Sequence, residues 1–202
     1  MSSRDIPVAP NPEVQPLLRQ FCLSLVDTFE KLKKITTTER ANVDKTLSKA
    51  ARLELISTAD PADTPFTVEA IDDIKTECVY EINQRLIKSG KIVEDLVESQ
   101  RLIFDHYHSL RLSCRNLDWS ESTDEPMVLG TPRQKPLDYY LQEGYRLAYQ
   151  LNGLITRIRV IYQAVDIDSV PSIMRFRDCL KVPEELDQYL SEVLCYVQFI
   201  IK

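Results

Sequence analysis

A continuous pattern of apolar residues between Leu137 and Val165 constrains the fold of this chain more than any other feature. Apolar residues recur there every three or four positions, which is the spacing of one face of an α-helix. A two-stranded coiled coil has two apolar columns per heptad, a and d, whereas this segment has three, so it predicts a helix packed in the groove of a bundle. The columns contain Leu137, Gly144, Leu151, Ile158 and Val165 at a, Tyr140, Leu147, Leu154 and Ile161 at d, and Leu141, Ala148, Ile155 and Tyr162 at e.

The a column of this helix includes a glycine, Gly144. Glycine costs about 1 kcal/mol of helix propensity relative to alanine, so its presence in a long helix needs a reason. Because glycine has no Cβ, a neighbouring chain can come unusually close to it. We therefore expect the backbone of another helix to approach Gly144.

Two long helical patterns precede this segment and predict an N-terminal helical hairpin. The first begins near Glu13, and the second runs from Phe66 to about Leu112, with a start signal at Thr64 and Pro65 or at Thr67. At about 1.5 Å per residue the second helix would be about 70 Å long, against about 43 Å for the later helix. Ser89 interrupts its apolar stripe, and a polar group in such a seam more often sets the register than binds a ligand.

The first helix contains a β-branched run, Thr36 to Thr38. Threonine loses side-chain freedom in a helix, and Thr36 with Glu39 has the spacing of a capping box. The run is a point where the helix can kink or restart before Val43, and the sequence leaves open whether the helix is continuous through it. A short helix near 172–180 and a last helix opened by Pro183 complete the pattern.

No segment alternates apolar and polar residues as a strand does, so the expected fold class is all-α: an elongated antiparallel helical bundle with a long N-terminal helical hairpin. We expect residues 1–12 to be a flexible leader and residues 13–202 to form a single helical domain. The acidic stretch within residues 113–136 lacks periodicity and is expected to be a mobile loop that contains the lone Trp119.

The balance of charge and the cysteines exclude several classes of protein. The chain has 25 basic and 31 acidic residues, so its net charge of −6 argues against direct binding of nucleic acid. No apolar run approaches the roughly 20 residues that span a bilayer, which argues against a membrane protein. The 5 cysteines form no Cys-x-x-Cys pair and are expected to be small buried residues in a reducing compartment.

The sequence lacks the usual motifs of catalysis. His106 and His108 are two residues apart in a predicted helix, so they point away from each other and cannot share a metal ion. The 4 glycines form neither a phosphate-binding loop nor a dinucleotide-binding motif, and no nucleophile elbow is present. We expect no catalytic residue, no cofactor and no metal site, and thus a protein that is not an enzyme.

Three stretches resemble one family over Asp73 to Lys202. They read DIKTECVYEINQRLIKSGKIVEDL, LDYYLQEGYRLAYQLNGLITRIRVIYQAVDIDSVPSI and LCYVQFIIK. In order and spacing they are similar to the AIRIM family of ribosome maturation factors, and the CINP family has a similar helical layout. This chain has Ala164 and, approximately, Arg177 where that family has tryptophans, so contacts through those indoles do not carry over.

The resemblance implies a non-enzymatic adaptor subunit of a type II AAA+ ATPase assembly, located in cytoplasm and nucleus. Its implied partners are the AAA+ ATPase subunits and a CINP-like helical subunit, and its implied role is cytoplasmic maturation of the large ribosomal subunit. A second hypothesis is a coiled-coil scaffold subunit of another complex, of the kinetochore, tethering or CINP-like replication-linked kind. A cryptic enzyme is the third, and it would need a pocket with convergent polar groups.

The candidate partner-binding residues fall into two groups. Tyr139, Tyr145 and Tyr149 lie outside the three apolar columns, so they face outward unless another helix or the acidic loop covers them. The second helix outreaches the later one, so one end of the hairpin is expected to keep an exposed apolar patch. The sequence leaves open which end this is. The candidates there are Leu47 and Ile71 at one end and Phe21 and Phe104 at the other, with Trp119 in the loop as a further candidate.

Overall fold

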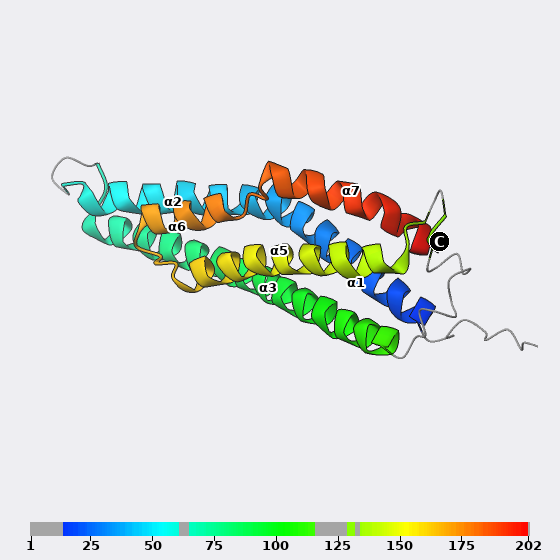
Figure 1. Cartoon of the computed structure of the whole chain (residues 1–202). Helices are drawn as coiled ribbons and strands as arrows, with labels where there is room; N and C mark the ends of the chain where they lie inside the picture. Colours follow the sequence, from blue (N-terminus) through cyan, green and yellow to red (C-terminus); the bar gives the residue numbers. More distant parts are fainter. Residues whose placement is uncertain (1–13, 61–64, 116–128, 132–133, 202) are drawn as a thin grey trace, which may run out of the picture. The chain divides into compact units, whose positions relative to one another are not determined.

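A computed structural model describes residues 14–60, 65–115, 129–131 and 134–201. Within these ranges the chain is all-α and forms no strand, as the sequence predicts, and its N-terminal half is a long helical hairpin (Figure 1). The elements in chain order are α1 (Val14–Lys34), η1 (Ile35–Glu39), α2 (Arg40–Thr58), α3 (Val68–Arg115), α5 (Leu137–Gln163), α6 (Val170–Cys179) and α7 (Glu184–Ile201).

Most helix boundaries follow the predicted signals. Thr67 caps α3, because its hydroxyl accepts a hydrogen bond from the Ala70 amide at 3.2 Å, so it is the start signal in use. Ser169 caps α6 in the same way by accepting from the Ser172 amide. The predicted start of the loop at Ser113 is wrong, because α3 continues to Arg115 and buries Cys114.

The threonine run forms a π-helical turn, η1, inside one continuous helical path from α1 to α2. Its flanking residues, Lys34 and Arg40, both have α-helical backbone angles, so the path neither restarts nor breaks. No capping box forms: the Thr36 hydroxyl lies 3.1 Å from the Leu32 carbonyl oxygen and 3.1 Å from the Leu180 carbonyl oxygen. Because a π-turn inserts one residue into a helix, it shifts the faces of α2 relative to those of α1.

Contacts within the chain group it into two compact units. Unit 1 comprises the described residues of Met1–Phe29, Ser99–Leu151 and Glu185–Lys202, and unit 2 comprises those of Glu30–Glu98 and Asn152–Glu184. The predicted leader at residues 1–12, Trp119 and most of the predicted loop lie outside the described residues.

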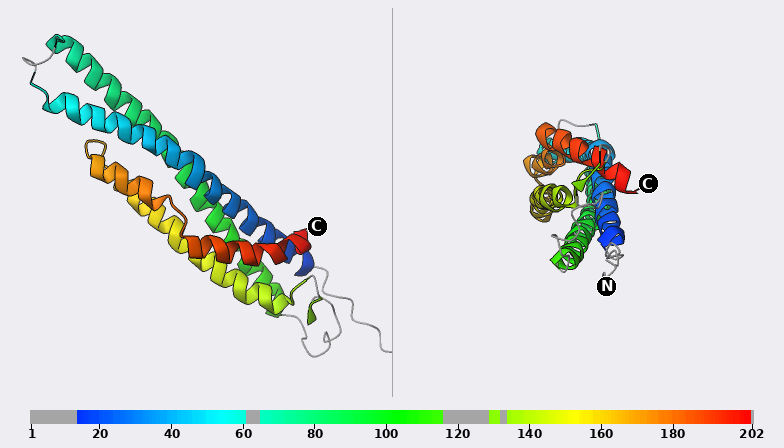
Figure 2. Two further views of the ribbon diagram at one scale, coloured as in Figure 1. Left: turned by 90° about the horizontal axis from the view of Figure 1, so that it is seen from above. Right: turned by 45° about the vertical axis from the view of Figure 1, so that its right-hand side comes forward.

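In unit 2, the arms of the hairpin run antiparallel beside each other (Figure 2), and Lys49 of α2 pairs with Glu81 of α3 at 3.1 Å. The short helix α6 packs beside α2 (Figure 1). There Arg177 donates to the Asp44 carboxylate at 2.7 Å. This contact is an ion pair at the surface of unit 2.

The three apolar columns of α5 face inward through most of the helix. The buried members are Leu137, Tyr140, Gly144, Leu147, Ala148, Leu151, Leu154, Ile155 and Ile158. The close approach expected at Gly144 exists, but it is made by the ring of Phe21 rather than by a backbone. A Cβ at this position would overlap that ring, so glycine is required by an aromatic neighbour.

The cysteines differ in their exposure, and this predicts their reactivity. Cys22, Cys78, Cys114 and Cys179 are buried as expected, whereas Cys195 is exposed, and all are free thiols. Burial raises the pKa of Cys22 to about 12 and the pKa values of Cys114 and Cys179 to about 11, because a thiolate is poorly solvated in the core.

We therefore expect Ellman's reagent at about pH 8, near the ordinary thiol pKa, to modify one thiol per native chain quickly, since the thiolate is the reactive form. Cys195→Ser should remove this fast phase, and denaturant should release the 4 buried thiols. Fast modification of Cys22 in the folded chain would contradict the packing of unit 1.

Candidate protein-binding surfaces

An aromatic column in unit 1 leads from the core to the surface. The Phe21 ring of α1 lies 5.5 Å from the Tyr107 ring of α3, and the Tyr107 ring lies 5.2 Å from the Tyr145 ring of α5. The Tyr107 hydroxyl donates to the Leu141 carbonyl at 3.3 Å, and burial raises the Tyr107 pKa above its ordinary value. The Tyr145 ring, at the outer end of the column, therefore packs against the ring of Tyr107, which is held in place and uncharged.

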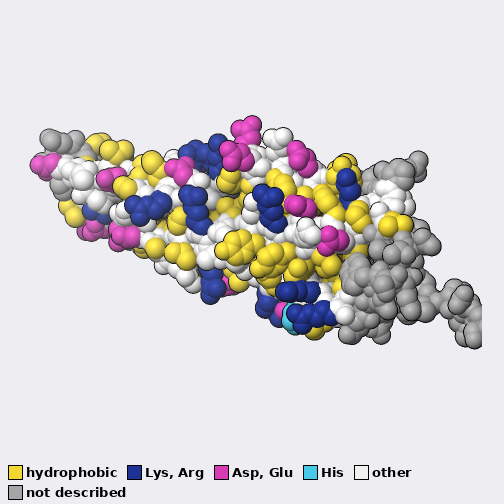
Figure 3. Space-filling model, viewed as in Figure 1, with side chains coloured by type: hydrophobic (Ala, Val, Ile, Leu, Met, Phe, Trp, Pro, Cys, Tyr) yellow, Lys and Arg dark blue, Asp and Glu magenta, His cyan; other side chains and the backbone are white. Residues whose placement is uncertain are grey.

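Two tyrosines of α5 stand on the outer surface of unit 1. Tyr145 is 46% exposed and Tyr149 is 63% exposed, and they are neighbours at positions i and i+4 of one helix. Hydrophobic side chains gather over α5 on the face shown in Figure 3. We define Tyr145 and Tyr149 as the tyrosine surface. Such a pair offers a large contact area with few rotatable bonds, as binding hot spots do.

The third candidate tyrosine, Tyr139, is half-buried within unit 1. Its ring packs edge-on against Tyr140 and against Tyr196 of α7, with centroid distances of 5.6 Å and 5.9 Å. The Lys135 ammonium lies 4.5 Å from the Tyr196 ring centroid and 5.6 Å from that of Tyr139. Tyr139 is thus partly covered by α7 and Lys135, so the tyrosine surface is defined by the other two residues.

A half-buried hydrogen bond joins α7 to α5 near this surface. The Tyr189 hydroxyl donates a hydrogen bond to the Glu143 carboxylate, and the Arg146 guanidinium lies 5.2 Å from the centre of the Tyr189 ring. Burial first, and then the hydrogen bond with Glu143, raise the pKa of Tyr189 well above its ordinary value. The phenol therefore stays a donor at neutral pH and positions this part of α5.

The candidates at the two hairpin ends occupy different environments. Phe21 is fully buried and Phe104 is half-buried in unit 1, so the interpretation of Phe21 as a surface contact is wrong. In unit 2, Ile71 is also buried and Leu47 is half-buried. Large exposed apolar side chains lie instead around the turn of the hairpin, at Leu55, Phe66 and Val68.

Sequence reasoning missed one buried charge. Glu39, the last residue of η1, has its carboxylate hydrogen-bonded to Ser89 of α3 and to Asn42 of α2. Ser89 was visible in the sequence as a polar residue in an apolar stripe. No sequence pattern identifies Glu39 as the partner of Ser89, because the two residues are 50 positions apart in the chain.

The described part of the chain contains no group of three or more residues that could hold a metal ion. None of its helices is long and apolar enough to cross a membrane. No protein-family model matches the chain, and comparisons with curated proteins and with solved structures also give no significant match. A function must therefore be inferred from the residues and their geometry.

Proposed function

We propose that this chain is a non-enzymatic adaptor subunit that works by protein–protein binding. The observation that carries the proposal is the tyrosine surface: Tyr145 and Tyr149 are exposed side by side, and the Tyr145 ring packs against half-buried Tyr107, which in turn packs against the buried ring of Phe21. Preorganised aromatic side chains lose little conformational entropy when a partner covers them. A folded monomer gains little from exposing them.

We further propose that the partners are subunits of a type II AAA+ ATPase assembly together with a CINP-like helical subunit, in cytoplasmic maturation of the large ribosomal subunit. These partners and this role are supported by the resemblance between the segment Asp73–Lys202 and the AIRIM family. The three-sided burial of α5 is typical of a helix in a bundle, and it argues against the two-sided seam of an extended coiled-coil scaffold.

Affinity capture with mass spectrometry tests the proposal. The natural chain should capture AAA+ ATPase subunits and precursors of the large ribosomal subunit. The variant Tyr145→Ala/Tyr149→Ala should capture them about tenfold less well, because it removes an aromatic anchor worth about 1–2 kcal/mol of binding free energy. Its melting temperature should stay nearly unchanged, since both side chains are exposed.

Tyr80→Ala is the matched control, because Tyr80 is 64% exposed but lies on α3 in unit 2. It should leave capture unchanged. Capture of no AAA+ subunit by the natural chain would overturn the proposed partners. Equal capture by the double variant would show that the tyrosine surface is not the contact.

A further inference from the structure

Glu39 is a buried carboxylate whose partners are neutral. Its side chain belongs to a residue that is 4% exposed, and it accepts hydrogen bonds from the Ser89 hydroxyl and from the Asn42 amide at 3.2 Å. Within the described structure no lysine or arginine forms an ion pair with it. Burying a charge without an ion-pair partner is costly, so Glu39 is expected to lower the stability of the free chain.

Ser89 of α3 supplies a hydrogen-bond donor beside Glu39. The Ser89 hydroxyl has one hydrogen and lies near two acceptors, the Glu39 carboxylate and the Arg85 carbonyl oxygen at 3.2 Å. When Glu39 is ionised, the hydrogen goes to the carboxylate, because a charged acceptor makes the stronger bond. Each carboxylate oxygen then accepts one hydrogen bond and keeps a free lone pair.

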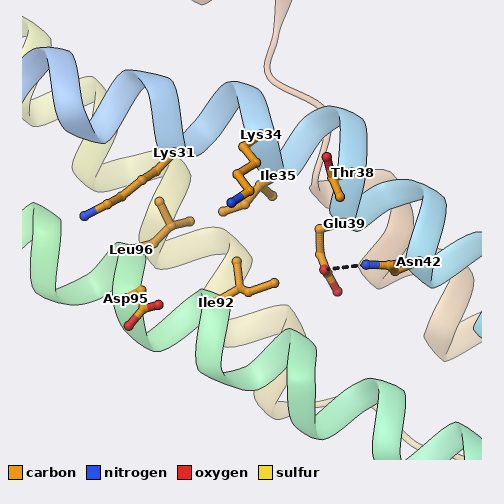
Figure 4. A pocket seen from close by; sticks show the side chains of 9 residues that line it. All are labelled: Lys31, Lys34, Ile35, Thr38, Glu39, Asn42, Ile92, Asp95 and Leu96. Atoms are coloured by element: carbon orange, nitrogen blue, oxygen red, sulfur yellow. Dashed lines mark hydrogen bonds between the residues drawn. The ribbon is translucent and has the colours of Figure 1, made fainter.

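Glu39 lines a cavity of about 250 Å³ in unit 2, between η1 and α3 (Figure 4). The apolar walls are Ile35, Ile92 and Leu96, which suit a hydrocarbon stem rather than a polar chain. A second cavity of about 340 Å³, toward Tyr80, shares Glu39 and Asn42 with the first. The carboxylate therefore borders two cavities instead of lying in closed packing.

The size and chemistry of the first cavity fit one side chain. Its volume is below the range of about 300–1,000 Å³ that is usual for drug-sized ligands. The two free lone pairs of Glu39 match the two parallel N–H groups of a guanidinium, which a single ammonium cannot match. Asp95, at the mouth, adds a second acidic group, and among the described residues no metal cluster competes for this site.

The chain carries its own competitor for such a cation. Lys34 reaches over the cavity toward α3 (Figure 4), and no hydrogen bond or ion pair of its side chain occurs within the described residues. Lys31 also lines the mouth. These ammonium groups repel an incoming cation and attract an anion. Removing the charge of Lys34 should therefore strengthen the binding of a cationic ligand and weaken the binding of an anionic one.

We propose that the cavity at η1 receives an arginine side chain of a protein partner, with its guanidinium on Glu39 and its stem against Ile92 and Leu96. This inference rests on the proposed function, because it assumes that the chain works by binding proteins. It adds a second contact, in unit 2, whose chemistry differs from that of the tyrosine surface in unit 1.

A small probe tests the site on the full chain without any partner. N-acetyl-arginine amide, titrated in a heteronuclear NMR experiment, should shift amide signals around Ile35 and Ile92 with a Kd on the order of 1 mM. N-acetyl-citrulline amide, the neutral analogue of the same shape, should bind at least tenfold more weakly. The binding of arginine amide should be lost in Glu39→Gln and should be severalfold tighter in Lys34→Gln.

Glu39→Gln should also raise the melting temperature of the free chain, because it removes the buried charge and keeps groups that can hydrogen-bond. Lys34 is exposed, so Lys34→Gln is expected to fold even if Glu39→Gln does not. Unchanged binding in Glu39→Gln, equal binding of citrulline amide, or weaker binding in Lys34→Gln would overturn the proposal. Because the probe is measured on the chain alone, its failure is distinct from a failure to capture the ATPase subunits.

Discussion

Phe21→Glu is expected to unfold the part of the chain that contains it. Phe21 is fully buried, and its ring packs against Tyr107 and fills the space above Gly144. Loss of a buried phenylalanine costs about 3–5 kcal/mol, and burial of an unpaired carboxylate costs several kcal/mol more. The sum approaches the whole stability of a typical domain, which is about 5–15 kcal/mol. Circular dichroism should show lost helix and no cooperative thermal transition.

Leu55→Glu is the control for this experiment, because it places the same charge at a residue that is 71% exposed, in α2 of unit 2. Its melting temperature should stay within a few degrees of that of the natural chain, since surface substitutions change stability by about 0.5 kcal/mol or less. A folded Phe21→Glu chain with an unchanged melting temperature would mean that Phe21 is at the surface and available to a partner.

Gly144→Ala and Gly153→Ala are expected to change stability in opposite directions. Both residues lie in α5, where alanine improves helix propensity by about 1 kcal/mol. At Gly144 the new methyl group would overlap the Phe21 ring, and overpacking of this kind costs about 1–3 kcal/mol. At Gly153 a Cβ would meet no atom within 4 Å. The free energy of unfolding should therefore fall in Gly144→Ala and rise in Gly153→Ala.

Urea denaturation of the two variants measures this difference directly as a change in transition midpoint at constant slope. Phe21→Leu should partly restore the stability of Gly144→Ala, because the two changes act in one contact and are not additive. Stabilisation by Gly144→Ala would show that the ring can move aside without cost, and that the glycine is not required by packing.

The helices themselves were predictable because their signals are local. Three apolar columns per heptad predicted α5 and its inward face, since the residues of a buried helix face recur at regular spacing in the sequence. The threonine run marked the irregular turn η1, because β-branched residues crowd a helix wherever they occur. The sequence also marked Gly144 as a site of close approach, although it could not identify the neighbour.

The tertiary structure decided which residues face each other, because a contact between distant segments leaves no periodic trace. Phe21 and Tyr149 are both aromatic residues of predicted helices, yet one is in the core and the other is at the surface. Glu39 and Ser89 are 50 residues apart, and the packing of the hairpin arms brings the carboxylate to the hydroxyl. The sequence by itself thus determined the helices and their buried faces. The packing of the helices decided which tyrosines are exposed and that the carboxylate of Glu39 is buried.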